Sequence, residues 1–133
     1  MKAVFADAFY FVALLNRADQ HHARVVATAR QLRENLITTD WVLMEFADAL
    51  AESACRRLVA PFVREMFQDP KVQIIAATAD LFQRALRLYE ERQDKSWTLT
   101  DCTSFVVMRD GNIMDALTGD HHFEQAGFKA LLI

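Results

Sequence analysis

The stretch that decides the fold covers residues 97–123 and reads WTLTDCTSFVVMRDGNIMDALTGDHHF. Its first half has the apolar spacing of a helix, with Thr100 as the predicted N-cap and Asp101 in the first turn. A Gly-Asn pair stops that helix. Residues 113–117 then form a short apolar run that is typical of a buried strand and is soon followed by Asp120. A carboxylate at the start of a helix and another just after a strand can meet at the carboxyl edge of a parallel sheet, where open α/β folds bind their ligands.

The rest of the chain alternates short apolar runs with longer amphipathic segments. We expect strands at residues 2–6, 36–38, 72–76, 113–117 and 128–133. We expect helices at residues 8–15, 21–34, 41–54, 55–68, 79–92, 101–110 and 123–126. Pro61 should divide or kink the fourth of these helices, because proline removes a helical hydrogen bond. Strands that alternate with helices predict a single α/β domain over residues 1–133, with a parallel sheet covered on both faces.

The composition limits the class of protein. With 53% hydrophobic residues and ten phenylalanines, the chain can bury a large core and is not disordered. The net charge of −3 argues only weakly against a nucleic-acid substrate, because acids that hold a metal ion would no longer repel phosphate. Cys55 and Cys102 lack metal-binding or redox spacing, so packing in a reducing compartment is expected. No run approaches ~18 uninterrupted apolar residues, and we expect a cytoplasmic protein with no membrane partner.

Four acids stand beside or within strongly apolar segments, where an unpaired charge is costly. They are Asp7, Glu45, Asp101 and Asp120. Each also has an ordinary explanation: the aspartates could cap or begin helices, and Glu45 could belong to a solvated stripe with Asp48 and Glu52. Two like charges ~4 Å apart repel by about 4 kcal/mol at an effective dielectric of ~20. A cluster of all four therefore needs a counter-charge, and hard divalent cations are the usual one.

Four segments together resemble the PIN-domain family, the metal-dependent ribonucleases that include the VapC-type toxins of bacterial toxin–antitoxin pairs. They are VFADAF near the start, TTDWVLMEFADAL around Glu45, LTDCTSF around Asp101 and ALTGDHHFEQAGF around Asp120. The resemblance runs over essentially the whole chain, and the last two segments are its most specific part. One departure is Ala8, where the family often has a hydroxyl residue after the first aspartate.

The resemblance implies a three-layer α/β/α fold whose central parallel sheet has about five strands in the order 3-2-1-4-5. It implies hydrolysis of RNA phosphodiester bonds with one or two Mg²⁺ or Mn²⁺ ions. The residues that would hold the ions and carry the reaction are Asp7, Glu45, Asp101 and Asp120. Thr118, two residues before Asp120, could support them by orienting a ligand or a water, although packing within the strand is its ordinary explanation. The implied partners are the RNA substrate, an antitoxin protein and a second copy of the chain in a homodimer.

Other α/β enzymes that handle phosphate fit less well. The haloacid dehalogenase group needs a second aspartate at the position of Phe9. Phosphate-binding loops need clustered glycines, and Gly111, Gly119 and Gly127 are scattered. Response-regulator receivers have paired acids after the first strand, but Asp7 has alanine on both sides. The remaining alternative is a PIN-like module that binds RNA or protein without cutting, and the presence of all four acids argues against it.

RNA beside an acidic centre must be held by basic side chains that contact its phosphates. Arg17, Lys95 and Arg109 are candidates because they occupy or end loops near the predicted site. Ordinary surface solvation explains any single one of them better.

Overall fold

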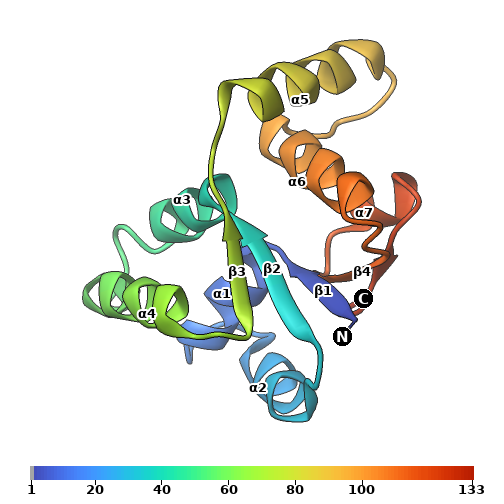
Figure 1. The fold of residues 1–133 in the computed structure, drawn as a ribbon. Coiled ribbons are helices and arrows are strands. Elements are labelled where there is room, and N and C mark those ends of the chain that lie inside the picture. The colour runs from blue at the N-terminus through green and yellow to red at the C-terminus, as the bar shows by residue number, and fades with distance from the viewer. Residues whose placement is uncertain (1) are drawn as a thin grey trace.

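Five strands form one parallel sheet in the computed structural model, which describes residues 2–133 (Figure 1). The order across the sheet is β3-β2-β1-β4-β5, and every neighbouring pair is parallel. The strands are β1 (Ala3–Ala6), β2 (Asn35–Thr39), β3 (Val72–Ile75), β4 (Asp115–Leu117) and β5 (Lys129–Ala130). The predicted fold class and strand order are confirmed.

Helices connect the strands and cover both faces of the sheet. They are α1 (Ala8–Leu15), α2 (His22–Gln31), α3 (Asp40–Ala49), α4 (Arg56–Gln68), α5 (Ala79–Glu91), α6 (Leu99–Asp110) and α7 (His121–Gln125). Figure 1 shows α1, α2 and α4 on one side of the sheet and α5, α6 and α7 on the other, while α3 contacts both α1 and α6. These are the three layers that the sequence predicts. Within residues 2–133, none of the helices has both the length and the apolar character needed to cross a membrane.

β1 lies in the middle of the sheet because its residues are apolar on both faces. Phe5 and Ala6 have no exposed surface, and Val4 is almost completely buried. A strand between two helical layers buries both of its faces, and a continuous apolar run satisfies that requirement. The register pairs Ala6 with Leu117 of β4, so the carboxyl ends of β1 and β4 lie side by side.

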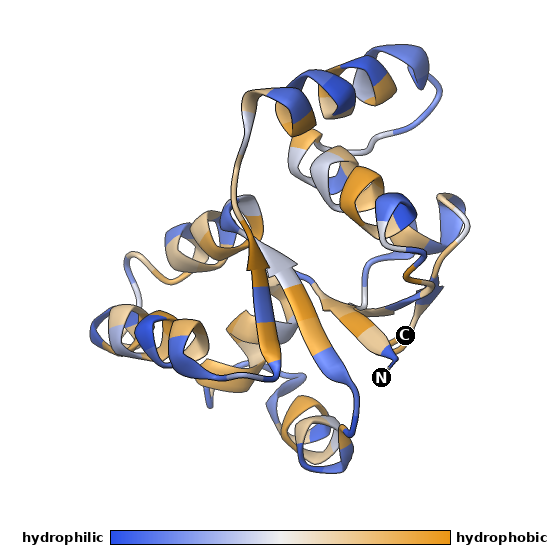
Figure 2. Ribbon diagram, viewed as in Figure 1, coloured by the Kyte–Doolittle hydropathy of each residue, from blue (hydrophilic) through white to orange (hydrophobic). Residues whose placement is uncertain are grey.

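Aromatic rings fill the core on both faces of the sheet. On one face, Phe105 of α6 meets Phe123 of α7 edge to face, with ring centroids 5.0 Å apart. On the other face, Phe46 packs against Phe11 and Phe62 at 5.6 and 5.9 Å. Each such pair contributes about 0.5–1.5 kcal/mol beyond its buried area. Hydrophobic and hydrophilic bands alternate along α4 and α5 in Figure 2, as expected for helices with one face on the core.

Several helix and strand ends differ from the sequence prediction. α2 ends at Gln31, earlier than expected, because Leu32 adopts an extended conformation on the way to β2. α3 ends at Ala49, also early, and the hydroxyl of Ser53 donates to the Leu50 carbonyl in the turn that follows. Serine hydroxyls bound to nearby backbone compete with helical hydrogen bonds in this way. β4 and β5 are likewise shorter than the apolar runs that predict them.

α4 runs without interruption from Arg56 to Gln68, so of the two effects predicted for Pro61, a division or a kink, the division does not occur. Pro61 lies inside the helix and is exposed. Buried side chains on the opposite face, Val59 and Met66, anchor the helix to the core. Tertiary packing of this amphipathic face therefore outweighs the hydrogen bond that proline removes.

Candidate metal centre

Asp7 follows β1 and occupies the N-cap position of α1, but its side chain does not cap that helix. Its Oδ2 atom accepts a 2.8 Å hydrogen bond from the hydroxyl of Thr118 instead. Asp7 is only 6% exposed, and Thr118 is fully buried. Burying a carboxylate is costly unless charge or several donors compensate it. Helix capping therefore does not explain Asp7, and a nearby cation would.

The electrostatic surroundings of Asp7 include two of the other predicted site residues. Burial raises the pKa of Asp7 from an ordinary 3.8 to about 7. The hydrogen bond from Thr118 lowers this pKa, whereas the negative charges of Glu45 and Asp101 raise it further. A like charge raises the pKa of a carboxyl group in this way when it lies nearby. The three acids therefore share one part of the molecule.

Asp101 is held by a capping box at the start of α6. The N-cap is Thr98, so the prediction of Thr100 is wrong. The Asp101 backbone N–H donates to the Thr98 hydroxyl at 3.0 Å, and Asp101 Oδ2 accepts from the Thr98 backbone N–H at 3.1 Å. These reciprocal bonds fix the buried carboxylate. Burial raises the pKa of Asp101, the hydrogen bond from the Thr98 N–H and the contact with His122 lower it, and the charge of Asp120 raises it.

Asp120 follows β4 and begins α7. Its Oδ1 atom accepts a 2.9 Å hydrogen bond from the backbone N–H of His122, which caps the helix. Its own backbone N–H donates to the hydroxyl of Thr118 at 3.1 Å. Because the same hydroxyl donates to Asp7, one buried threonine joins the segments that carry two of the acids.

Glu45 lies in the middle of α3 and is more exposed than the buried Asp101. Partial loss of hydration at its carboxyl end raises the pKa of Glu45, and the charges of Asp101 and Asp120 raise it further. Glu45 therefore lies near Asp101 and Asp120, and it is more exposed to solvent than they are. Asp48 and Glu52, the other acids of that stretch, are exposed, as the sequence predicts.

His122 is not among the predicted site residues, and the structure places it beside two of the acids. Its Nδ1 atom lies 3.0 Å from Asp101 Oδ2 and 3.4 Å from Asp120 Oδ1. The side chain of the neighbouring His121 is instead 74% exposed. Both histidines follow Asp120 directly, and which of them turns inward depends on how α7 packs against α6. No local pattern in the sequence distinguishes them.

The donors in this region suit a hard divalent cation. Four residues form what we call the acidic cluster: Asp7, Glu45, Asp101 and Asp120. Carboxylate oxygens are the ligands that Mg²⁺ and Mn²⁺ prefer. One ligand atom from each of Asp101, Asp120 and His122 lies within 4.8 Å of the other two, close enough to share one ion. The raised pKa values of Asp7, Glu45 and Asp101 reflect burial and mutual repulsion that a bound cation would offset.

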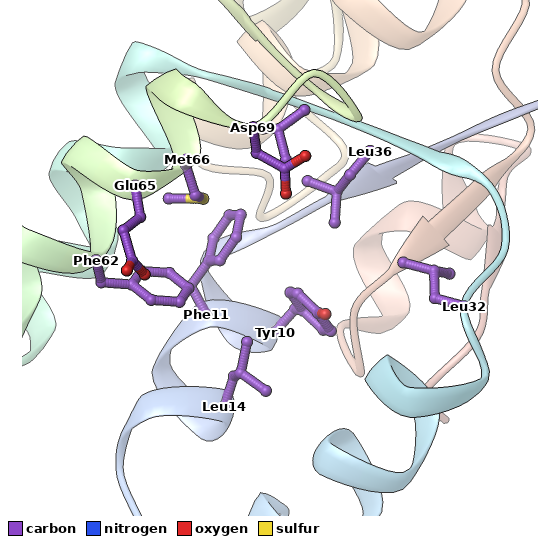
Figure 3. A pocket seen from close by; sticks show the side chains of 10 residues that line it. Tyr10, Phe11, Leu14, Leu32, Leu36, Phe62, Glu65, Met66 and Asp69 are labelled. Carbon is purple, nitrogen blue, oxygen red and sulfur yellow. The ribbon is translucent and has the colours of Figure 1, made fainter.

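A separate cavity of about 260 Å³ lies at the other edge of the sheet (Figure 3). Its lining includes Leu36 and Val72, near the amino ends of β2 and β3, whereas Asp7 follows the carboxyl end of β1. The walls are mainly apolar, with the carboxylates of Glu65 and Asp69 among them. This cavity is therefore distinct from the acidic cluster, which occupies the sheet edge expected for a ligand site in a parallel sheet.

The three basic residues considered for phosphate contact lie in different places. Arg109 is in the last turn of α6, at the opposite end of that helix from Asp101. Arg17 lies beyond the far end of α1 from Asp7. Lys95 precedes α6 and forms an ion pair with Asp94 at 3.8 Å. Of these three residues, only Lys95 is close in the chain to the start of α6, the helix that carries Asp101.

Comparison with known families identifies the fold. The family model of the PIN domain matches residues 4–129. The chain belongs to the PIN-domain family. The matched stretch contains all of the acidic cluster and nearly the whole sheet, in agreement with the strand order.

Individual relatives extend this result. The chain is 29% identical to the 23S rRNA-specific endonuclease VapC20 of Mycobacterium tuberculosis over 129 residues, 94% of this chain and 95% of that protein. The crystal structure of Mycobacterium tuberculosis VapC20, described as a sarcin-ricin loop cleaving toxin, matches with a TM-score of 0.85 and 26% identity, covering 94% of this chain and 95% of that one.

Two more distant structures share the fold. FitAcB from Neisseria gonorrhoeae has a TM-score of 0.66 at 16% identity and covers 96% of this chain and 95% of its own. VapBC2 from Rickettsia felis, bound to a DNA fragment from its promoter, has a TM-score of 0.64 at 12% identity and covers 96% of both chains.

Proposed function

We propose that this PIN domain, residues 1–133, is a metal-dependent endoribonuclease that hydrolyses RNA phosphodiester bonds as the toxin of a type II toxin–antitoxin pair. The observation that carries the proposal is the meeting of Asp7, Asp101 and Asp120, with Glu45 beside them, at the carboxyl edge of the sheet. Buried like charges oppose folding unless they serve a ligand. The likeness to VapC20 supports the same activity.

In this proposal, the acidic cluster holds one or two divalent ions, Mg²⁺ or Mn²⁺. Asp7 and Asp101 are direct ligands, Asp120 binds directly or through water, and Glu45 acts mainly through water. The order of burial supports this assignment, because Asp7 and Asp101 are 6% and 7% exposed whereas Glu45 is exposed. Mg²⁺ keeps several of its waters, so a few direct carboxylates suffice.

The residues of the chain would bind and orient the reacting groups. A bound divalent ion supplies Lewis acidity for the phosphodiester and an acidified water as the nucleophile. Thr118 would hold the Asp7 carboxylate in one orientation through its 2.8 Å hydrogen bond, and the Thr98 backbone would do the same for Asp101 at 3.1 Å. Glu45, at the solvent side, is placed to orient a water or accept its proton.

The likeness to known toxins supports a choice of substrate and partners to test. Because VapC20 is named as a 23S rRNA-specific endonuclease, ribosomal RNA is the first substrate to test. We further propose an antitoxin protein as a partner, a homodimer as the assembled form, and the cytoplasm as the place of action, where the RNA is found. Co-expression with the protein of the neighbouring reading frame, followed by size-exclusion chromatography, tests the first two of these proposals.

The decisive experiment is cleavage of 23S rRNA and of end-labelled RNA fragments by the purified chain, with Mn²⁺, with Mg²⁺ and with EDTA. We expect cleavage that EDTA abolishes and that Asp101→Asn reduces by at least a hundredfold. Asp48→Asn is the matched control, because Asp48 is an exposed carboxylate on the same helix as Glu45. RNA binding without cleavage by the wild type in either metal would instead support the non-catalytic PIN-like module.

A further inference from the structure

The imidazole of His122 is aimed at the acidic cluster. Its Nδ1 atom is 3.0 Å from Asp101 Oδ2 and 3.4 Å from Asp120 Oδ1. The family resemblance assigns ion binding to carboxylates alone, so this nitrogen is an additional donor. It comes from α7, whereas Asp101 comes from α6, so the two ligand atoms belong to different elements.

The spacing of these atoms is that of neighbouring ligands on one ion. Around an octahedral ion with bonds of ~2.1 Å, adjacent donor atoms are ~3 Å apart and opposite donors ~4.2 Å apart. The two distances from His122 Nδ1 fall at or slightly above the adjacent value. All three ligand atoms lie within 4.8 Å of one another. The two distances from His122 therefore suit an ion shared with Asp101 and Asp120.

The backbone around His122 keeps the ring in place. Its N–H donates to Asp120 Oδ1 at 2.9 Å, so the residue is fixed in the first turn of α7. The next residue, Phe123, has no exposed surface and packs against Phe105 of α6 at 5.0 Å. The ring is thus held toward α6 by the core, while 28% of the His122 side chain stays exposed to solvent.

We propose that His122 binds the divalent ion directly through Nδ1, together with Asp101 and Asp120, and that this nitrogen biases the centre toward Mn²⁺ over Mg²⁺. The inference rests on the proposed function and specifies which of the two proposed ions the site prefers. Both ions bind carboxylates, but Mg²⁺ favours an all-oxygen shell more strictly, and the transition metal Mn²⁺ accepts an imidazole nitrogen more readily. A ligating imidazole is neutral and carries its proton on Nε2.

A second role for the ring is the competing explanation. If Nδ1 carried a hydrogen and only donated to the carboxylates, His122 would orient Asp101 and Asp120 without touching the ion. The two roles differ in one measurable respect, because only a ligand places nitrogen in the first coordination shell. His121 provides the control, since it is adjacent in sequence, exposed, and 4.0 Å from Glu124 rather than beside the acidic cluster.

The test uses pulsed electron paramagnetic resonance of the full chain loaded with Mn²⁺. We expect the wild type to show the hyperfine coupling of one directly bound ¹⁴N nucleus. His122→Ala should lose this coupling, and His121→Ala should keep it. Labelling the wild type with ¹⁵N-histidine should change the coupling to that of ¹⁵N, which makes the test independent of how well any variant folds.

Calorimetric titration with Mn²⁺ and with Mg²⁺ completes the test. We expect the wild type to prefer Mn²⁺, and His122→Ala to weaken Mn²⁺ binding by about tenfold or more, with a smaller effect on Mg²⁺. An unchanged ratio of the two dissociation constants, or a Mn²⁺ spectrum with oxygen donors only, would overturn the proposal.

These outcomes separate the inference from the function on which it rests. If Mn²⁺ binds and RNA is cut in a metal-dependent way, but no nitrogen is coupled, only the role of His122 is wrong. If the wild type binds neither ion and still cleaves RNA in EDTA, both the metal-dependent mechanism and the role of His122 are wrong.

Discussion

The hydroxyl of Thr118 donates a 2.8 Å hydrogen bond to the carboxylate of Asp7, although the two residues stand 111 positions apart in the chain. The same oxygen accepts from the backbone N–H of Asp120 at 3.1 Å. A single buried side chain therefore links two acids that follow adjacent strands of the sheet, Asp7 after β1 and Asp120 after β4.

Replacing Thr118 by valine tests that link. Valine keeps the shape but removes the hydroxyl, so Asp7 loses its donor and Asp120 loses its acceptor. We expect the free energy of unfolding to fall by about 1–3 kcal/mol and RNA cleavage to fall by about tenfold to a hundredfold. Denaturant melts and initial cleavage rates measure the two effects. Thr118→Ser, which keeps the hydroxyl, should retain most of both properties; equal losses in the two variants would assign Thr118 to packing alone.

The raised pKa of Asp7 predicts how stability depends on pH when no metal is bound. The folded chain holds a proton on Asp7 up to a pKa of about 7, whereas the unfolded chain releases it near 3.8. The folded state therefore binds more protons between these values, and its stability falls as pH rises through about 7. Between pH 5 and pH 8 the expected loss from Asp7 is roughly 2–3 kcal/mol.

Denaturant melts in EDTA at several pH values measure this loss. Asp7→Asn should be less sensitive to pH over the same range and more stable than the wild type at pH 8. Mn²⁺ should flatten the wild-type curve, because the ion stabilises the ionised carboxylate. A variant whose stability falls with pH as steeply as that of the wild type would show that Asp7 does not cause the effect.

Asp101→Asn separates the charge of this residue from its role in capping α6. An asparagine oxygen can still accept from the Thr98 N–H, so the capping box is retained while one negative charge is removed. A saturating ion stabilises the wild type by ~2.7 kcal/mol at a hundredfold excess over its dissociation constant, a rise of several degrees in melting temperature. We expect the variant to be at least as stable as the wild type in EDTA and to lose most of the Mn²⁺-induced rise.

Thermal melts with EDTA and with Mn²⁺ check this prediction, with Asp48→Asn as the control that should keep the full rise. If Asp101→Asn responds to Mn²⁺ as the wild type does, Asp101 serves only as part of the helix cap. An absent rise in the wild type would count against a metal site altogether.

Gly119 connects Thr118 to Asp120, and its lack of a side chain is required by a close neighbour. A Cβ atom at this position would lie 2.6 and 2.9 Å from two atoms of the Phe9 ring. Gly119→Ala should therefore displace the ring or the segment that carries Asp120. We expect a loss of about 1–3 kcal/mol in stability and a clear loss of cleavage. Phe9→Leu should partly restore both in the double variant, and additive losses would contradict the proposed clash.

Much of the fold can be predicted from the sequence because short local patterns mark its strands and helices. The apolar run at residues 2–6 predicts a strand followed by the acid Asp7, and the structure has β1 at Ala3–Ala6 with Asp7 directly after it. The error at the start of α6 arose because Thr98 and Thr100 are both good caps. Only Thr98 has an acid three residues later, and the reciprocal bonds with Asp101 depend on that spacing.

Contacts between segments that are distant in the chain could not be predicted from local sequence patterns. Nothing local in the sequence says that His122, rather than His121, turns toward Asp101, because that choice follows from the packing of Phe123 against Phe105. The roles of the acidic cluster in metal binding and cleavage remain proposals that the experiments above test.

The pairing of β4 with β1 also determines when the contacts of Asp7 can form during translation. A ribosome that has made Asp7, Glu45 and Asp101 holds a chain in which Thr118 and Asp120 do not yet exist. Asp7 acquires its hydrogen-bond donor, and β1 its β4 neighbour, only after residue 118 has been added and has left the ribosome. Translation that stops before this point therefore yields a chain that holds three of the four acids but lacks the Thr118 hydroxyl that donates to Asp7.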